Sequence, residues 1–475
     1  MKLRLFPIAT LLLALAIVPA CSDDDDDNVP EQQPSQEQGS DSDKDAEDSD
    51  PSESETPAEP EDNTYVLNAA DIQVTLSSEG NLVTTVGQPF VAKVSTVTDE
   101  GITYQWACDG TVVSDTKECN YAFPQAGEYA LTLSVSQGDS VSIAFQVDAV
   151  ATFEPIDAPD ASATPYVTKV LDYLPAPGQF TNTLPEYEEG DTQEDMNRKC
   201  LENIGNNEQI MISLGGWGGY VVVGFDHTIQ NVSGKRDFLV LGNAFQAATN
   251  PDEDNLPGGS CEPGIIMVAY DVNHNGVPDD NEWYEIAGSA HHDATAERFY
   301  VKGLENGNDM ATIFDYEMTY HRPLTEENDA DFKSGFFNIK NYIAWKDNQG
   351  NSGYKVKNTF HKQTYYPQWV TDDQITFRGT RLPENGIDES GAGTYFVLYK
   401  FLYGYSDNEP NTDDNCGIDI DWAVNAKNQK VHLPGVDFIK VYTGVNQENG
   451  WLGECSTEVM GVNDLHLLGK EIDTL

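Results

Sequence analysis

The chain has 475 residues and a formal net charge of -54 at pH 7, with 80 acidic residues against 26 basic ones. This excess of negative charge repels phosphates and anionic lipids, which argues against nucleic-acid binding and against docking on a membrane surface. Divalent cations and neutral or cationic ligands remain compatible with it.

The N-terminus is predicted to be a signal peptide that ends in a lipidated cysteine. Residues 1–21 begin with basic side chains, continue with an apolar run too short to span a bilayer, and end at Cys21. Val18-Pro-Ala-Cys21 resembles a bacterial lipobox, and Ser22–Asp27 resembles the surface-export signal of Bacteroidota lipoproteins. The resemblance implies a lipid on Cys21 and display on the outer membrane at the cell surface. The alternative is an ordinary secretory signal with a chance cysteine.

Residues 22–64 are predicted to be a disordered tether. They hold 18 acidic residues and one lysine, with almost nothing apolar to bury. Such a composition cannot offset the entropy of the chain, and like charges extend it. About 410 residues remain after it, which is enough for two or three domains, each with its own core.

Residues 65–150 are predicted to form an Ig-like β-sandwich. Apolar and polar side chains alternate over 129–135 and again over 141–147, as in two half-buried strands of a hairpin. The run Phe123–Tyr129 resembles the last hairpin of PKD and related immunoglobulin-like domains. Residues 151–164, rich in Pro, Ala and Asp, are interpreted as a linker.

Six cysteines remain besides Cys21, an even number in a compartment where disulfides form. Cys108 and Cys119 fall in the first domain, where Trp106 is expected in the core beside a bridge between them. The other four allow three pairings, and the sequence does not choose among them: Cys200, Cys261, Cys416 and Cys455.

Residues 165–475 are predicted to form a larger, jelly-roll-like β-sandwich with one short helix, so the whole chain belongs to the all-β class. Thr192 and Asp195 can form a capping box, and Gly205 can end the helix. The later segments have the apolar runs of strands without alternating helices, which favours an antiparallel sandwich. The expected strands are 220–225, 237–241, 264–271, 283–287, 394–405 and 436–443.

Asp271–Glu282 matches the twelve-residue calcium loop. Oxygen-bearing ligands occur at the required spacing, with Gly276 at the sharp turn. No helices flank the loop, so we expect a structural calcium ion that ties a β-hairpin; the alternative is a polar turn that binds nothing. The predicted ligands are Asp271, Asn273, Asn275, Val277, Asp279 and Glu282. The acidic stretch 407–415 has oxygen donors but no such template; it is expected to be a solvated loop, and the alternative is a cation site.

Four aromatic residues are predicted to bind the ligand. Trp217 stands in a run of glycines that would let its ring lie exposed, although a bulge with the ring in the core is an equal alternative. Tyr365, Tyr366 and Trp369 surround Pro367 in a predicted loop, where rigid rings give contact area at low entropic cost.

Three stretches, Gly215–Phe245, Glu262–Glu285 and Gly417–Glu454, resemble a family of PKD-like cell-surface lipoproteins of gut Bacteroidota. Some members are associated with cobalamin uptake, so the resemblance implies capture of a nutrient, first of all cobalamin, for a TonB-dependent transporter. In that case the membrane is contacted only through the lipid. The alternative is a calcium-stabilised carbohydrate-binding or adhesin protein, with a glycan as the partner.

Catalysis is not expected. No HExxH or GxSxG motif occurs, and Ser352-Gly-Tyr-Lys355 lacks the companion motifs that would give its spacing a meaning. A hydrolase would need a cleft with two converging carboxylates. The chain is therefore predicted to bind without turnover.

Replacing Cys21 with alanine should release or mislocalise the protein, because the lipid is the only membrane attachment that the sequence predicts. Deleting Asp23–Asp27 should keep the anchor but lose surface display. Protease added to intact cells measures this display. Equal digestion of the wild type and the deletion variant would contradict the export signal.

Overall fold

The computed structural model describes Leu67, 72–76, 83–96, 101–138, 141–206, 209–247, Leu256, 258–324, 339–358 and 360–474. The chain divides into Met1–Thr64 and a compact unit, Tyr65–Leu475. Cys21 and the acidic tether lie outside the described residues. Within the described ranges, no helix combines the length and the apolar character that a membrane span requires.

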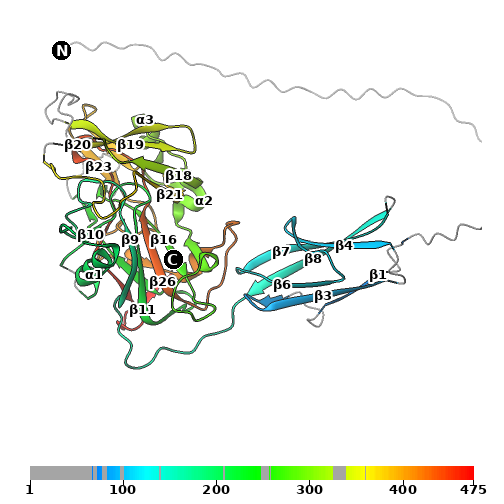
Figure 1. The fold of residues 1–475 in the computed structure, drawn as a ribbon. Coiled ribbons are helices and arrows are strands. Elements are labelled where there is room, and N and C mark those ends of the chain that lie inside the picture. Colours follow the sequence, from blue (N-terminus) through cyan, green and yellow to red (C-terminus); the bar gives the residue numbers. More distant parts are fainter. Residues whose placement is uncertain are drawn as a thin grey trace, which may run out of the picture. The chain divides into compact units, whose positions relative to one another are not determined.

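The first eight strands form an Ig-like sandwich of two sheets, with strand orders β1-β3-β6 and β2-β8-β7-β4-β5 (Figure 1). Trp106 and Phe123 are fully buried in its core, as alternation predicts for inward-facing positions. β7 and β8 pair antiparallel, which confirms the predicted hairpin. The strands are β1 Ile72–Leu76, β2 Val83–Thr85, β3 Pro89–Thr96, β4 Ile102–Cys108, β5 Thr111–Ser114, β6 Glu118–Ala122, β7 Gly127–Gln137 and β8 Val141–Thr152.

A six-stranded antiparallel sheet is the centre of the larger, jelly-roll-like sandwich (Figure 1). Its middle strands are buried and carry apolar side chains on both faces. These buried side chains include Val221, Ile266 and Ile439. In spatial order the strands are β25 Ala423–Val424, β17 Trp283–Ile286, β16 Gly264–Ala269, β26 Gly435–Thr443, β11 Tyr220–Gln230 and β9 Lys169–Leu174.

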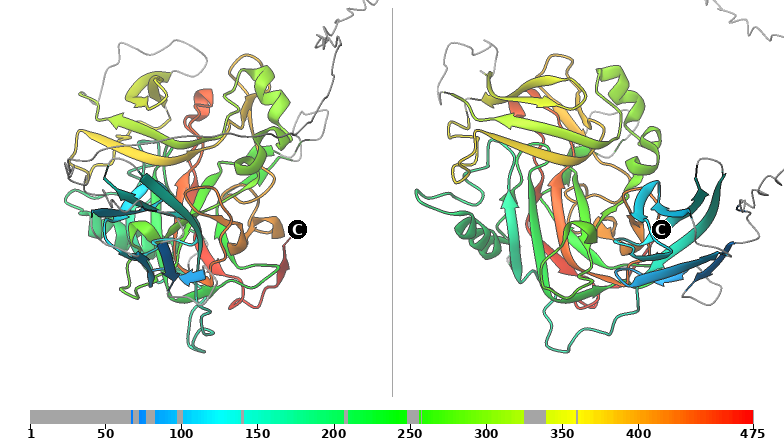
Figure 2. Two further views of the ribbon diagram at one scale, coloured as in Figure 1. Left: turned by 90° about the vertical axis from the view of Figure 1, so that its right-hand side faces the viewer. Right: turned by 45° about the vertical axis from the view of Figure 1, so that its right-hand side comes forward.

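A four-stranded sheet, coloured green to yellow in Figure 2, packs over one end of this central sheet. Its order is β20-β19-β18-β21, with bounds Ser352–Asn358, Ile339–Asp347, Ile313–His321 and Gln374–Arg381. The sequence did not predict it. Smaller sheets complete the domain: β14 Phe245–Gln246, β15 Gly258–Ser260, β23 Phe396–Tyr399 and β22 Gly386–Asp388; β24 Gly417–Ile418, β13 Phe238–Leu241 and β28 Gly461–Asp464; β10 Ile212–Ser213 with β27 Glu458–Val459; and β12 Lys235–Arg236 with β29 Ile472–Asp473.

The predicted helix is confirmed as α1, Gln193–Ile204, with the capping box of Thr192 and Asp195 in place. Two further helices, α2 Ser289–Asp293 and α3 Tyr300–Asn306, are too short to show an apolar period in the sequence. Single 3-10 turns occur at η2 Asp280–Glu282, η3 Ala294–Ala296, η5 Asp414–Cys416, η6 Ile420–Trp422 and η7 Gly450–Leu452.

The six described cysteines are free and buried, so the predicted disulfides are wrong. Cys108 and Cys119 lie on strands of different sheets, and Cys200 packs on the inner face of α1. Burial raises the pKa of Cys119 to about 11. These thiols therefore stay protonated and fill space as small apolar groups.

The glycine run around Trp217 is a tight turn that places the ring in the core. The indole is fully buried and lies edge-on to Tyr316, with ring centroids 4.7 Å apart. Gly215 has a φ of +68°, and a Cβ on Gly219 would lie 1.9 Å from the carbonyl oxygen of Leu214. Backbone packing, rather than ligand access, explains these glycines.

Gly219→Ala should lower the melting temperature strongly, because the added methyl group would meet main-chain atoms that cannot move aside. The matched control is Gly234→Ala, whose φ is +74° but whose Cβ would meet nothing within 4 Å. The free energy of unfolding of the control should fall by only about 1–2 kcal/mol, which is the cost of placing a residue with a Cβ in the left-handed backbone conformation. If Gly219→Ala and the control had equal melting temperatures, the packing argument would be contradicted.

Candidate functional site

The structure contradicts the predicted aromatic ligand surface at three of its four positions. Trp217, Tyr365 and Tyr366 are all 0 % exposed. The indole N–H of Trp217 donates to the carbonyl of Thr380, so its polar group is satisfied inside the core. The four-stranded sheet, which the sequence did not reveal, contributes the apolar residues around these rings.

Trp369, the fourth predicted residue, is half-buried against other rings. It stacks on Tyr173 with centroids 5.8 Å apart and on Tyr187 at 6.2 Å. Its indole N–H donates to Oε1 of Gln193 on α1. These contacts give Trp369 a structural role in docking α1.

The predicted calcium loop joins β16 to β17, and the two strands pair antiparallel, which confirms the hairpin. The two carboxylate oxygens of Asp271 accept the N–H groups of Asn275 and Gly276 at 3.0 and 2.7 Å. Burial raises the pKa of Glu282, and the charges of Asp271 and Asp279 raise it further. The two oxygens of Glu282 accept the N–H groups of Val272 and Asp279, both at 2.9 Å, so local hydrogen bonds hold this loop and calcium binding there stays a prediction.

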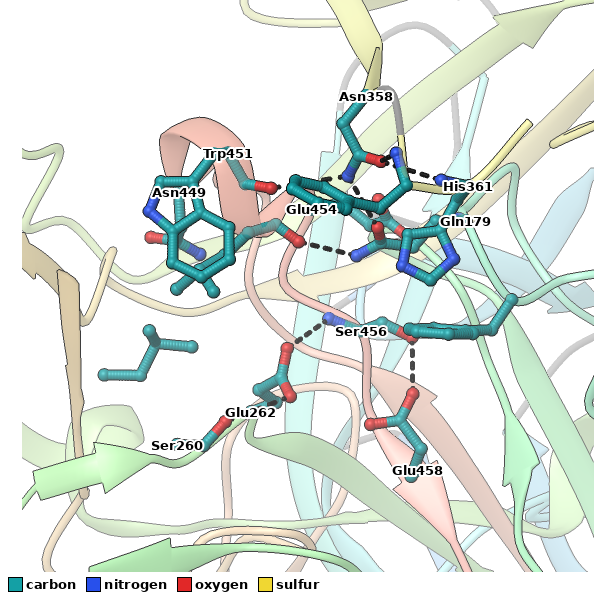
Figure 3. A pocket seen from close by; sticks show the side chains of 14 residues that line it. Gln179, Ser260, Glu262, Asn358, His361, Asn449, Trp451, Glu454, Ser456 and Glu458 are labelled. Carbon is teal, nitrogen blue, oxygen red and sulfur yellow. Dashed lines mark hydrogen bonds between the residues drawn. The ribbon is translucent and has the colours of Figure 1, made fainter. Parts of the chain in front are cut away.

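A separate pocket of about 310 Å³ opens where loops from several sheets meet (Figure 3). Its wall comes from the loop after β9, the segment between β15 and β16, the end of β20, and the segment from η7 to β27. The sequence did not predict this site.

Aromatic and apolar side chains form the rim of the pocket. Phe360 is 60 % exposed, and its ring centroid lies 6.3 Å from that of Trp451. Phe180 and His361 form a second pair, edge to face at 4.7 Å. Exposed rings next to a cavity offer flat contact area to a ligand.

Side-chain amides hold the wall of the pocket together (Figure 3). Gln179 donates from Nε2 to the carbonyl of Leu452 at 2.6 Å, and its Oε1 accepts from Nδ2 of Asn358 at 3.0 Å. Asn449 is 1 % exposed, and its Oδ1 has no hydrogen-bond donor among the described residues. This oxygen is itself buried and lies beside Gly386, where an added Cβ would be 2.0 Å from it.

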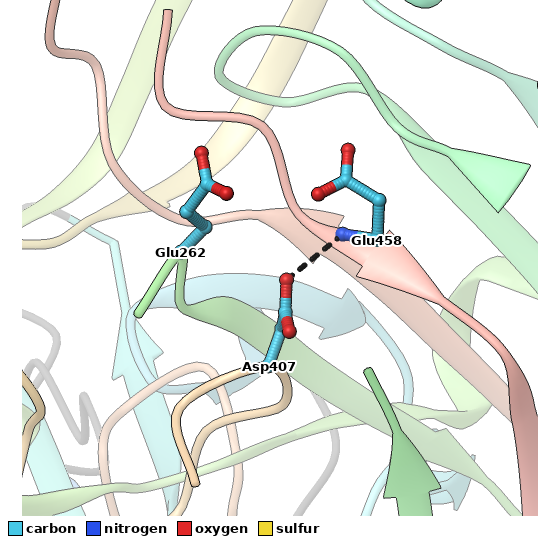
Figure 4. Close-up of side chains that lie close together, drawn as sticks. All are labelled: Glu262, Asp407 and Glu458. Carbon is cyan, nitrogen blue, oxygen red and sulfur yellow. Dashed lines mark hydrogen bonds between the residues drawn. The ribbon is translucent and has the colours of Figure 1, made fainter. Parts of the chain in front are cut away.

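Two residues of the pocket lining, Glu262 and Glu458, belong to an acidic cluster, which we define as Glu262, Asp407 and Glu458 (Figure 4). One carboxylate oxygen of each lies within 4.8 Å of the others. Glu262 accepts the N–H of Ser456 at 3.0 Å, and Glu458 accepts the Ser456 hydroxyl at 3.0 Å. Segments that are distant in sequence are thereby brought to one point.

Backbone donors hold Asp407 in the cluster. Its Oδ1 accepts the N–H groups of Asn243 and Ala244, both at 2.7 Å, and its Oδ2 accepts the N–H of Glu458 at 3.0 Å. A Cβ on Gly242 would lie 2.3 Å from Asp407 Oδ1, which explains the glycine at this close approach.

Burial and mutual repulsion raise the pKa values of these carboxyl groups. Burial, together with the charge of Asp407, raises the pKa of Glu262 to about 8. Burial and the charge of Glu448 raise the pKa of the neighbouring Glu454 to about 8. Burial raises the pKa of Asp407 to about 7, even though backbone donors lower it. The group therefore favours protons, hydrogen-bond donors or cations as partners.

The nearby lysines do not neutralise this charge. Lys355 lies 3.1 Å from Glu448, and Lys400 forms an ion pair with Glu409. In the part of the chain that the structure describes, no lysine or arginine forms an ion pair with a member of the acidic cluster.

The expectation that 407–415 is a solvated loop is wrong at its start, since Asp407, Asn408 and Glu409 are buried. Glu262 and Glu458 follow no motif, and an acidic chain offers too many carboxylates for single ones to stand out. A usable signal in the sequence was Gly242, which lies between a predicted strand and Asn243. A glycine next to a strand marks a place where another part of the chain comes close to the backbone.

No family model matches this chain, and no curated protein sequence matches it. Among solved structures, a β-sandwich carbohydrate-binding module of promiscuous specificity is 10 % identical, with 83 % of this chain and 96 % of that chain covered and a TM-score of 0.16. The Bacteroides ovatus SGBP-B in complex with a mixed-linkage heptasaccharide is 11 % identical, with 84 % and 98 % covered and a TM-score of 0.18. A SusE-like protein is 9 % identical, with 83 % and 97 % covered and a TM-score of 0.14. TM-scores this low do not establish a shared overall fold, so the function has to be argued from the site itself.

Proposed function

We propose that the protein is a surface-displayed binding protein that captures a carbohydrate in the pocket described above, without turnover. The observation that carries this proposal is the combination of an exposed aromatic rim with buried, acceptor-rich side chains beneath it. Few ligands match both parts, and sugars are among them.

The rim and the wall suit different parts of a sugar. The rings of Phe360 and Trp451 can pack against the apolar C–H face of a pyranose. The hydroxyl groups of the sugar are donors, and the carboxylates of Glu262, Glu454 and Glu458 in the pocket lining are acceptors. A hydrogen bond from a hydroxyl to one of these buried carboxylates would offset part of its desolvation cost.

The size of the pocket favours a sugar over cobalamin. A volume of about 310 Å³ is at the lower limit of ligand pockets. It suits one sugar unit, whereas a corrin macrocycle would have to remain largely outside. Burial of Trp217, Tyr365 and Tyr366 also removes the broad aromatic surface on which the cobalamin hypothesis relied.

The predicted lipid anchor and acidic tether would place the pocket outside the cell. Capture of a glycan at the cell surface supports uptake only if a transporter then takes the glycan across the outer membrane. A TonB-dependent outer-membrane transporter therefore remains the proposed partner. An adhesin that holds a glycan without uptake is the second candidate, and the same pocket would serve it.

Trp451→Ala should raise the dissociation constant for the bound sugar about 30-fold, because truncating a central aromatic anchor costs about 2 kcal/mol. Isothermal titration calorimetry with a panel of mono- and oligosaccharides, and with cobalamin, measures the change. Chromatography of the sugar after incubation should show no cleavage.

The matched control is Phe314→Ala, which removes a ring that is 46 % exposed and does not line this pocket. It should bind as the wild type does. If only the titration with cobalamin gives a heat of binding, the carbohydrate proposal is overturned in favour of cobalamin capture. If neither cobalamin nor any sugar gives a heat of binding, both ligand proposals are overturned.

We also propose that calcium binds at Asp271–Glu282 and stabilises the hairpin. An ion that binds only the folded state adds about 2.7 kcal/mol at a hundredfold excess over its dissociation constant. Chelator should therefore lower the melting temperature of the wild type by more than that of Asp271→Ala/Glu282→Ala. Asp280→Ala, an exposed non-ligand position in the same loop, is the control. Equal shifts in the wild type and the double variant would indicate a turn without an ion.

A further inference from the structure

We propose that the acidic cluster is a second divalent-cation site, in which Glu262, Asp407 and Glu458 ligate Ca²⁺ at the base of the pocket. This inference does not depend on carbohydrate binding, because the ion would be held by the protein alone. It is also separate from the loop at Asp271–Glu282.

The spacing of the oxygens fits calcium. Calcium–oxygen distances are about 2.3–2.6 Å, so two oxygens on opposite sides of one ion are about 4.6–5.2 Å apart. The three carboxylate oxygens lie within 4.8 Å of one another, which allows all of them to reach one ion. Magnesium, with distances of about 2.0–2.1 Å, would require a tighter group.

The donor set is also that of a hard cation. All three ligands are carboxylates, and Ser456, which hydrogen-bonds to Glu262 and Glu458, adds a hydroxyl beside them (Figure 3). The buried Cys261 and Cys455 are not members of the cluster. Oxygen-only sites select calcium, magnesium or manganese over zinc or copper.

A fourth carboxylate, outside the cluster, independently points to a missing partner. Glu454 lines the same pocket and is 3 % exposed. Its Oε1 accepts the N–H of Gln179 at 2.6 Å, but its Oε2 has no partner among the described residues. Its charge contributes to the raised pKa of Glu262, and both carboxylates line the same pocket. Buried charges of one sign are retained in proteins when a cation or hydrogen bonds compensate them.

The test is Ca²⁺ titration of chelator-treated protein by calorimetry, in the background of Asp271→Ala/Glu282→Ala so that the loop does not contribute. This background should still bind one Ca²⁺. Adding Glu262→Gln and Glu458→Gln should raise the dissociation constant at least 100-fold, because two of the three charged ligands become neutral. Glu297→Gln, which alters a buried carboxylate that does not line this pocket, is the control and should leave Ca²⁺ binding unchanged.

Thermal melts of the same variants show whether each variant is folded. The two glutamines remove repulsion, so the variant should melt above its parent in chelator and below it in saturating Ca²⁺. Failure of the background to bind Ca²⁺, or unchanged binding after the glutamine replacements, would overturn the proposal and leave carboxyl groups that hold protons instead. Sugar titrations of the wild type, run separately, decide the carbohydrate proposal on their own.

Discussion

Acidic side chains buried without an equal number of basic ones are the constraint on which the larger sandwich depends. Asp407 can sit at the meeting point of the loops because three backbone N–H groups point at it, two from Asn243 and Ala244 and one from Glu458. Those donors require the chain at Gly242 to pass too close for any side chain. The turn after β13, the start of β27 and the loop after β23 that carries Asp407 are thus fixed relative to one another by hydrogen bonds to a carboxylate rather than by an apolar contact.

The same constraint shapes the pocket. Carboxylates line its wall, and the side-chain amides of Gln179 and Asn358 already donate hydrogen bonds within the protein. A ligand that brings donors or positive charge gains from these acceptors, whereas an anionic ligand is repelled. The rim rings of Phe360 and Trp451 add contact area without demanding a particular polar group. Selectivity therefore rests on hydroxyl or cationic character.

The two calcium proposals also differ in kind. In the hairpin loop, Asp271 and Glu282 come from one short segment, and their hydrogen bonds are local. In the acidic cluster, the ligands come from three distant segments, so an ion there would add a link between parts of the fold that hydrogen bonds also join. Such cross-linking stabilises the folded state over a longer chain loop than a hairpin ion does.

Local chemistry in the sequence determined the features whose causes are local. The cap of α1 at Thr192, the β7–β8 hairpin and the hairpin around Asp271–Glu282 each depend on residues within a few positions of one another, and the structure confirms all three elements. Alternating or continuous apolar runs likewise predicted most strands of the central sheet. The tertiary structure alone decided which side chains are buried. Tyr365 and Tyr366 are in the core because a sheet formed by distant strands covers them, and Glu262, Asp407 and Glu458 meet because loops from different sheets converge. Sequence periodicity records which face of an element a residue occupies, but not what lies opposite that face, and for this reason the site could not be predicted.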